Sequence, residues 1–169
     1  FNVTVEATNS VGSDSQPFTV TVFEVPTITS TAVTTVEVGN AYSYNVNASG
    51  YPAPTFAFSG TPPSGMTIDS VTGVISWTPT TSGAFNVTVE ATNSYGSDSQ
   101  PFTVTVFELP SITSTAVTSV EVGNAYSYNV NASGYPAPTF ALTTKPAGMT
   151  IDSNTGVISW TPASTGTFN

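Results

Sequence analysis

Carboxylates are the side chains in this sequence whose type and spacing suit acid–base chemistry. Ten acidic residues accompany a single basic residue, Lys145, and no histidine. Glu90 and Asp98 flank one predicted loop, and two carboxylates about 5–10 Å apart can hydrolyse a glycosidic bond. The pair has no basic or histidine partner, and near-identical repeats would place it in every domain. We therefore expect no catalytic residues and no enzyme.

Asparagines within Asn-x-Ser/Thr triplets are a second group with potential chemistry. Four occur, about the number that chance gives in a chain this rich in serine and threonine, at Asn2, Asn47, Asn86 and Asn131. Asn47 and Asn86 lie on the polar phase of predicted strands and should face water, where N-linked glycans fit. Asn131 is the repeat counterpart of Asn47, so Asn47, Asn86 and Asn131 are the glycosylation candidates. O-linked sugar on threonine stays an alternative.

Two tyrosines in predicted loops, Tyr51 and Tyr95, are candidates for stacking on a sugar or on a neighbouring subunit. The alternative is that they pack over the loop prolines Pro52, Pro54 and Pro79.

Composition excludes several classes of function. One basic residue and a formal net charge of −9 leave nothing to neutralise phosphates, so we expect no nucleic-acid binding. Without histidine or cysteine there is no Ser-His-Asp triad, cysteine nucleophile, ordinary zinc site or disulfide. No apolar run is long enough for a transmembrane helix, so no membrane insertion of this segment is expected. Hydrophobic residues at 38% suffice for a packed core.

An internal repeat organises the chain. Residues 1–57 recur at 85–141 with four substitutions, and the remainder aligns after a one-residue deletion. A period of about 84 residues suits a small β-domain. Prolines after Val25 and Leu109 suit junctions with minimal linkers. We predict the last two strands of a preceding repeat at 1–24, a complete repeat at 25–108, and the first strands of a following repeat at 109–169. Both limits fall at the same Phe-Asn point, as expected for a window from a longer array.

Alternation with a period of two dominates each repeat. The clearest predicted strands are 42–49, 85–92 and 102–106, with shorter ones at 28–31, 36–38, 55–58, 66–69 and 74–77. No segment has helical periodicity. The pattern predicts an all-β fold of antiparallel β-sandwiches with about seven strands per repeat, whose core includes Tyr44, Val46, Val87 and Val89.

One stretch resembles a known family. Gly65-Met66-Thr67-Ile68-Asp69-Ser70-Val71-Thr72-Gly73-Val74-Ile75-Ser76-Trp77-Thr78-Pro79, followed by Ser82–Val89, resembles the immunoglobulin-like repeat domain of large bacterial and archaeal surface proteins. That family is related to the cadherin-like domains of dystroglycan. The resemblance implies tandem immunoglobulin-like sandwiches in an extracellular protein, such as an adhesin, a stalk or a spacer in a secreted enzyme.

The cadherin-like resemblance makes calcium the one cofactor to consider. Calcium needs six to eight oxygen ligands, usually from clustered carboxylates. The candidates Glu37, Asp69, Glu90 and Glu108 are scattered, and no Asp-x-Asp run occurs. Asp69 before Thr72-Gly73 is better explained as the opening residue of a tight turn. We expect no cofactor and no metal, unless the glutamates gather at a junction.

These observations predict a structural, non-catalytic segment of a long extracellular surface fibre, sheath or adhesin stalk. Its partners would be copies of itself, end to end, and glycans. Two alternatives for the junction stay open: the polypeptide continues, or residues 1–24 of one subunit complete residues 109–169 of the next by strand donation. Rival functions are a carbohydrate-binding adhesin module, a spacer of a secreted glycosidase and a surface-layer lattice subunit.

Overall fold

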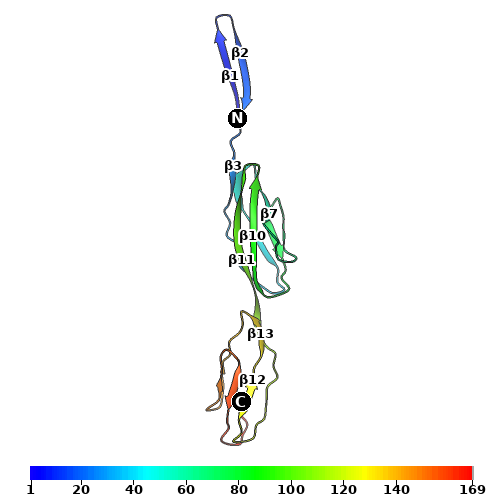
Figure 1. Cartoon of the computed structure of the whole chain (residues 1–169), viewed down its shortest axis with the longest axis vertical. Coiled ribbons are helices and arrows are strands. Elements are labelled where there is room, and N and C mark those ends of the chain that lie inside the picture. The colour runs from blue at the N-terminus through cyan, green and yellow to red at the C-terminus, as the bar shows by residue number, and fades with distance from the viewer. Residues whose placement is uncertain (169) are drawn as a thin grey trace. The chain divides into compact units, whose positions relative to one another are not determined.

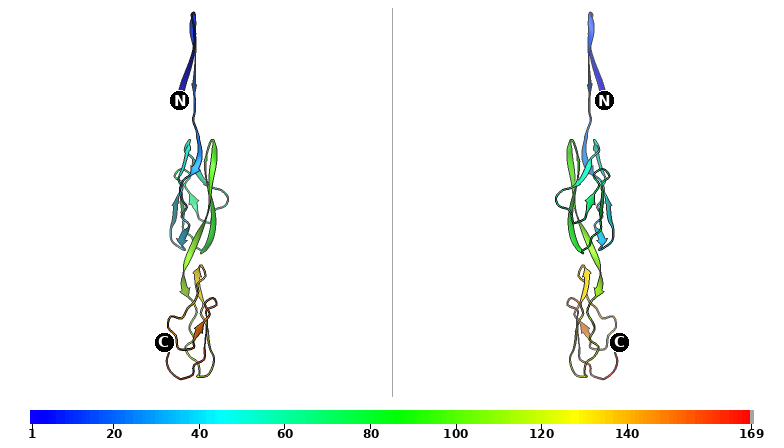
Figure 2. Two further views of the ribbon diagram at one scale, coloured as in Figure 1. Left: turned by 90° about the vertical axis from the view of Figure 1, so that its left-hand side faces the viewer. Right: turned by 90° about the vertical axis from the view of Figure 1, so that its right-hand side faces the viewer.

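The chain consists of strands and loops. The computed structural model describes residues 1–168, and Asn169, the end of the predicted segment 109–169, lies outside the described residues. Figures 1 and 2 show arrows and loops without a helix. Accordingly, the described part of the chain holds no helix that could cross a membrane. The predicted all-β class is confirmed.

The strands divide between two compact units of interleaved segments. The first unit comprises residues 1–33, 43–77 and 86–102, and the second comprises residues 34–42, 78–85 and 103 onward. The strands are β1 (Asn2–Asn9), β2 (Gly12–Thr19), β3 (Glu24–Ile28), β4 (Thr35–Glu37), β5 (Tyr42–Asn45), β6 (Ala48–Tyr51), β7 (Thr55–Phe58), β8 (Thr67–Ile68), β9 (Val74–Trp77), β10 (Gly83–Asn93), β11 (Gly96–Ile112), β12 (Tyr126–Asn129), β13 (Ala132–Tyr135), β14 (Thr150–Ile151) and β15 (Val157–Trp160). We call residues 25–108 the middle repeat and residues 109–168 the last repeat.

In the first unit, β1 and β2 form a separate antiparallel hairpin, in which Val3 lies opposite Phe18 and Val5 opposite Gln16. In the other pairings, β3 joins β6, and β9 lies between β5 and β8. β7 joins β10, which neighbours β11. Alternation puts one side of each strand inward. The predicted core residues Tyr44, Val46, Val87 and Val89 are all buried.

The predicted strand 42–49 is two strands, which corrects the sequence interpretation. β5 pairs within the sheet of β9, whereas β6 pairs with β3. Between them, the Val46 N–H donates to the Gly73 carbonyl and the Asn47 carbonyl accepts from Thr29. The chain therefore changes sheets at Val46–Asn47 without breaking the alternation that the sequence shows.

The two prolines that the sequence places at repeat junctions, Pro26 and Pro110, lie inside strands. β3 and β11 run through Pro26 and Pro110, and the ladders are irregular between Glu24 and Thr27 and between Glu108 and Ser111. A proline is tolerated at such an irregularity because no N–H is needed there. The Pro26 backbone lies against Gly50, whose φ of +144° and missing side chain permit the approach.

In the second unit, the last part of β11 pairs in parallel with β4 and antiparallel with β13. A second sheet joins β12, β15 and β14. Within the described last repeat, the counterparts of β4 and β7 at 119–121 and 139–142 are not strands. In the middle repeat those two strands form by pairing with β11 and β10.

Candidate interaction site

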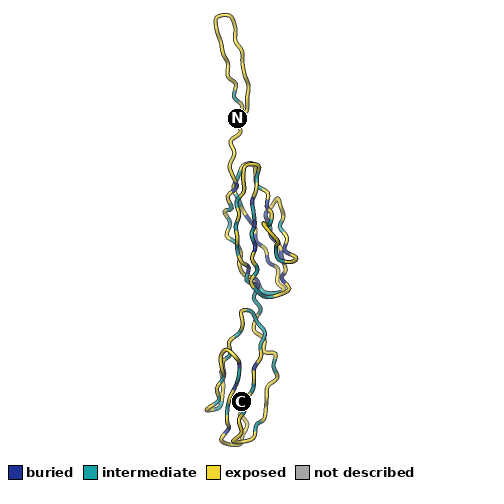
Figure 3. The backbone as a smooth tube through the Cα atoms, in the orientation of Figure 1, coloured by how far each residue is buried: buried dark blue, intermediate teal, exposed yellow. Residues whose placement is uncertain are grey.

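The hairpin of β1 and β2, residues 2–19, carries an apolar face that its unit leaves uncovered. Strand alternation places Val3, Val5 and Ala7 on one face together with Phe18 and their other cross-strand neighbours. Val5 is 54% exposed, and Phe18, Val20 and Val22 are exposed as well. Figure 3 shows this hairpin exposed almost throughout, whereas β10 and β11 carry buried positions.

The same sequence is buried elsewhere in the chain. Residues 85–108 repeat residues 1–24 with one substitution, Tyr95 for Val11. Val89 and Val106, the counterparts of Val5 and Val22, are fully buried, as is Val104. One sequence therefore has two environments, and burying Val5 and Val22 alone would remove side chains worth about 1.5–3 kcal/mol each from water.

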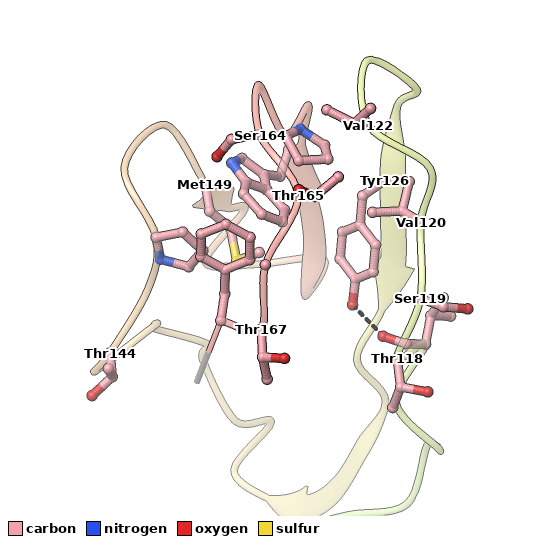
Figure 4. A pocket seen from close by; sticks show the side chains of 16 residues that line it. Thr118, Ser119, Val120, Val122, Tyr126, Thr144, Met149, Ser164, Thr165 and Thr167 are labelled. Atoms are coloured by element: carbon pink, nitrogen blue, oxygen red, sulfur yellow. Dashed lines mark hydrogen bonds between the residues drawn. The ribbon is translucent and has the colours of Figure 1, made fainter.

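The last repeat holds a hollow of 670 Å³ (Figure 4). Its walls include Val120, Tyr126, Met149 and Trp160, drawn from the loop before β12, β12 itself, the loop before β14, and β15. Each is partly exposed, while the counterparts Val36, Tyr42, Met66 and Trp77 of the middle repeat are buried.

The tyrosine in this hollow is already partly desolvated. Burial raises the pKa of the Tyr126 phenol, and the nearby Tyr128 adds to the shift. The Tyr126 hydroxyl donates to the Val117 carbonyl at 2.8 Å, the dashed line in Figure 4. The hollow therefore has a mixed lining of apolar side chains and serine and threonine hydroxyls, and the hydroxyl of its one phenol is hydrogen-bonded.

A polar cluster ties β11 to the first strands of the middle repeat. The Tyr44 hydroxyl donates to Gln100 Oε1 at 2.7 Å, and Gln100 Nε2 donates to the Ser30 carbonyl at 2.8 Å. The Ile28 N–H donates to Asp98 Oδ2 at 2.7 Å. Sequence reasoning missed Gln100. The available signal was that Asp98 and Gln100 occupy the same alternating phase as Val104 and Val106, which is the inward one.

The last repeat has the same tyrosine and serine with a different pairing. Tyr128 contacts Ser114 Oγ at 2.7 Å and donates to the Ser114 carbonyl at 3.3 Å. In the middle repeat, Ser30 Oγ also lies 2.7 Å from Tyr44, but the glutamine takes the second contact. The Tyr128 hydroxyl therefore donates to the Ser114 carbonyl at 3.3 Å, whereas the Tyr44 hydroxyl donates to Gln100.

The carboxylates predicted as calcium candidates are placed apart. Glu37 accepts from the Asn40 amide, Glu108 lies 3.4 Å from the Ser82 hydroxyl, and Glu90 lies in β10 opposite Ala57. Asp69 accepts the backbone N–H groups of Val71 and Thr72. Among residues 1–168, no group of three or more acidic side chains could hold a metal ion.

In the predicted carboxylate pair of Glu90 and Asp98, Asp98 has a structural role. Asp98 accepts N–H groups with both oxygens, from Ile28 and from Ser99. Its carboxylate is therefore held by backbone contacts rather than presented to a substrate.

Acid should weaken the turns at Asp69 and Asp152. Backbone hydrogen bonds hold the pKa of each carboxyl below its ordinary value. The largest contribution comes from the N–H of Thr72 at Asp69 and from the N–H of Thr155 at Asp152. Because the folded pKa is depressed, the stabilisation is complete above the unfolded value of 3.8 and is lost as pH falls through the folded pKa. Urea midpoints at pH 6 and pH 2.5 should differ less for an Asp69→Asn, Asp152→Asn chain than for the wild type. An equal difference would contradict the assignment.

The glycosylation candidates Asn47, Asn86 and Asn131 are all exposed, as is Asn2. Glycosylation at these positions stays a prediction. Tyr51 is 60% exposed at the end of β6, and the peptide bond between Tyr51 and Pro52 is cis.

Tyr95 contacts the segment before the middle repeat. Its ring stacks on Phe23 with centroids 4.0 Å apart and planes 3° from parallel. Beside it, the Asn93 amide donates to the carbonyls of Glu24 and Pro52. These contacts hold the chain where residues 1–24 join the middle repeat.

Removing the Tyr95 ring should free Phe23. The stack is worth about 1 kcal/mol, so Tyr95→Ala should abolish the upfield ring-current shifts of the Phe23 protons in NMR spectra. Tyr51→Ala, which removes a ring that the Phe23 stack does not use, is the control. Retained shifts in Tyr95→Ala would show that another residue holds Phe23.

A family model described as "Putative Ig domain" matches residues 25–107 and 109–169. No curated protein matches the sequence. Among solved structures, the titin I-band fragment I67–I69 is 19% identical with a TM-score of 0.59, covering 94% of this chain and 62% of that one. The Drosophila OTK extracellular domains 3–5 are 18% identical with a TM-score of 0.57, covering 94% and 60%.

A chain from Bacteroides fragilis, titled a "putative alpha-galactosidase", is 26% identical with a TM-score of 0.45. The match covers 53% of this chain and 19% of that one, so this chain spans about a fifth of its length.

Proposed function

The chain belongs to the "Putative Ig domain" family, and on that premise we propose that it is a structural, non-catalytic repeat segment of an extracellular fibre, sheath or adhesin stalk. The predicted resemblance and the tandem immunoglobulin-like fold are confirmed by two family matches and by neighbours that are immunoglobulin-domain tandems. Two junctions are compatible with this role: the polypeptide continues from one repeat into the next, or residues 1–24 of one copy complete residues 109–169 of the next by strand donation.

The observation that carries this proposal is the recurrence of one immunoglobulin-like repeat along the chain, which the family model matches twice. Residues 85–108 pair with strands of residues 25–84, and residues 109–141 repeat the first part of that segment, 25–57, with three substitutions. Their contacts include the parallel pairing of β11 with β4 and the antiparallel pairing of β10 with β7. Residues 1–24 have the sequence of residues 85–108 apart from position 11, whereas the counterparts of β4 and β7 at 119–121 and 139–142 are not strands.

Continuity of β11 supports the mechanical role. This single strand of 17 residues pairs with β4 and then with β13, across the boundary between the two family matches. The segment between the two family matches therefore holds no Gly- or Ser-rich linker. Repeats joined in this way suit a structural segment.

Assembly of the purified chain tests the proposal. Sedimentation velocity should show species that grow with concentration, and electron micrographs should show linear assemblies. Val5→Asp puts a charge at a position whose counterpart Val89 is fully buried, and should reduce association more than a hundredfold. Thr4→Asp adds the same charge on the other hairpin face and should assemble normally. A wild-type chain that remains monomeric would refute strand donation.

A carbohydrate-binding adhesin is the second candidate, because the Tyr51 ring is 60% exposed. A glycan array probed with the chain and with Tyr51→Ala separates the two functions. Binding that depends on Tyr51 would favour the adhesin role.

A further inference from the structure

We infer that the residue at position 95, and at its counterpart in other repeats, sets how stiffly a repeat holds the repeat before it, and that tyrosine at this position makes the joint stiff. This inference rests on the proposed structural function and specifies where the stiffness of such a segment resides. It concerns the start of the middle repeat, where residues 23–26, 50–52 and 93–96 lie together within the first unit. We call these residues the joint.

The boundary between two repeats has no spare residues. At the end of the middle repeat, Phe107 is still held by its own repeat, because it pairs in the ladder with β4. The next residue, Glu108, already pairs with β13 of the last repeat. By the same count, Phe23 ends the preceding repeat, and Glu24, which pairs with β6, begins the middle one. A contact between Phe23 and the middle repeat is therefore a contact between repeats.

Two side chains of the turn between β10 and β11 hold the entering strand. The Asn93 amide donates to the Glu24 carbonyl at 2.8 Å and to the Pro52 carbonyl at 3.0 Å. The Tyr95 ring reaches one residue further, to Phe23, with ring centroids 4.0 Å apart and planes 3° from parallel. The asparagine thus acts within the middle repeat, whereas the tyrosine acts across the boundary.

The turn itself does not need a tyrosine. In the hairpin of β1 and β2, Asn9 Oδ1 accepts the Val11 N–H at 2.8 Å, just as Asn93 Oδ1 accepts the Tyr95 N–H at 2.9 Å. The same turn therefore forms with valine or with tyrosine. The Tyr95 ring has its role outside its own turn, in the stack on Phe23.

Position 95 is also where the repeats differ most in chemistry. Of the four substitutions between residues 1–57 and 85–141, three exchange one aliphatic or one hydroxyl side chain for another, whereas Val11 corresponds to Tyr95. A valine has no ring to stack on a phenylalanine. A repeat with valine here keeps the asparagine and loses the stack across the boundary. An array that mixes the two residues therefore has stiff and mobile joints at places that the sequence specifies.

Spin-label distances within single molecules of the full chain test the inference. The chain contains no cysteine, so Thr4→Cys, Ser76→Cys places one label on the hairpin and one on β9, both at exposed positions. A stack of this kind shifts an equilibrium about fivefold. Tyr95→Val should therefore raise the population of unstacked joints about fivefold and widen the distance distribution. Tyr95→Phe, which keeps the ring, should retain the distribution of the wild type.

Tyr51→Val is the matched control, because it removes an exposed tyrosine of β6 and leaves the stack intact. In the same chains, the heteronuclear NOE of the Phe23 amide should fall for Tyr95→Val and stay unchanged for Tyr51→Val. Urea midpoints followed by Trp77 fluorescence, in a Trp160→Phe background, should be alike for the two variants, which shows that the middle repeat is intact. Equal widening by both variants would overturn the inference.

The outcomes separate the inference from the proposed function. The distances are intramolecular and are measured at low concentration, so they do not depend on assembly. A distribution that Tyr95→Val leaves unchanged overturns the inference and leaves the structural role standing, because that role rests on the recurrence of the repeat. Glycan binding through Tyr51 would contradict the structural role, and the spin-label distances would still decide the inference.

Discussion

Replacing Gly73 by alanine is expected to destabilise the middle repeat by about 3 kcal/mol or more. Gly73 has a φ of +72°, and an alanine Cβ there would overlap the Val46 carbonyl oxygen and press on the Phe56 ring. A left-handed conformation costs a residue with a side chain about 1–2 kcal/mol, and overpacking adds about 1–3 kcal/mol. The Val46 carbonyl cannot retreat easily, because the adjoining Val46 N–H is bonded to the Gly73 carbonyl.

Gly65→Ala is the matched control for this substitution. Gly65 has a φ of +79°, but no atom lies near the position of an added Cβ. It should cost only the backbone term of about 1–2 kcal/mol. Urea unfolding followed by Trp77 fluorescence, in a Trp160→Phe background, measures both variants. Equal losses would show that backbone conformation alone, and not the contact with Val46, requires glycine.

Ile75→Ala is expected to cost about 3–4 kcal/mol, the second large effect. The Ile75 side chain is fully buried in β9, opposite Ile68 of β8. Removing a buried isoleucine loses its transfer free energy and leaves a cavity, for a total of 2–5 kcal/mol. Val71→Ala, at a side chain that is 79% exposed, should change the free energy of unfolding by less than about 0.5 kcal/mol.

Ile158→Ala makes the same deletion at the counterpart position. Ile158 is 8% exposed, and its repeat contains the open hollow. Because surrounding groups can relax into open space, the cost should be smaller, about 2 kcal/mol. Fluorescence of Trp160, in a Trp77→Phe background, follows this repeat. A larger loss for Ile158→Ala than for Ile75→Ala would contradict the description of the last repeat as the less covered of the two.

Much of the local structure could be predicted from alternation. Thr55–Phe58 and Val74–Trp77 are strands with the predicted bounds, and the strand predicted at 85–92 lies within β10. These segments have their apolar residues on one phase and hydroxyl or amide residues on the other, so period alone fixes both the strand and its inward face. The division into segments 1–24, 25–108 and 109–169 stays a prediction.

The candidate site was less predictable, because its key side chains are polar. Asp98 suggested a carboxylate pair with Glu90, yet its carboxylate binds the backbone N–H of Ile28, 70 positions away. The sequence pattern did not identify Gln100 as a functional residue, although its side chain joins Tyr44 to Ser30. The partner of an inward-facing polar residue depends on which distant strand lies opposite it. The sequence pattern alone does not predict which strand that is.

The sequence by itself determined the strands, their inward faces and the repeat that copies them, because these follow from side-chain alternation and chain geometry. Tertiary structure alone decided which copies of an apolar face are covered. Val5 and Val89 have identical neighbours along the chain, yet one is 54% exposed and the other fully buried. Burial depends on a second surface coming into contact, and for Val89 that surface is carried by residues far away in the chain, among them β7.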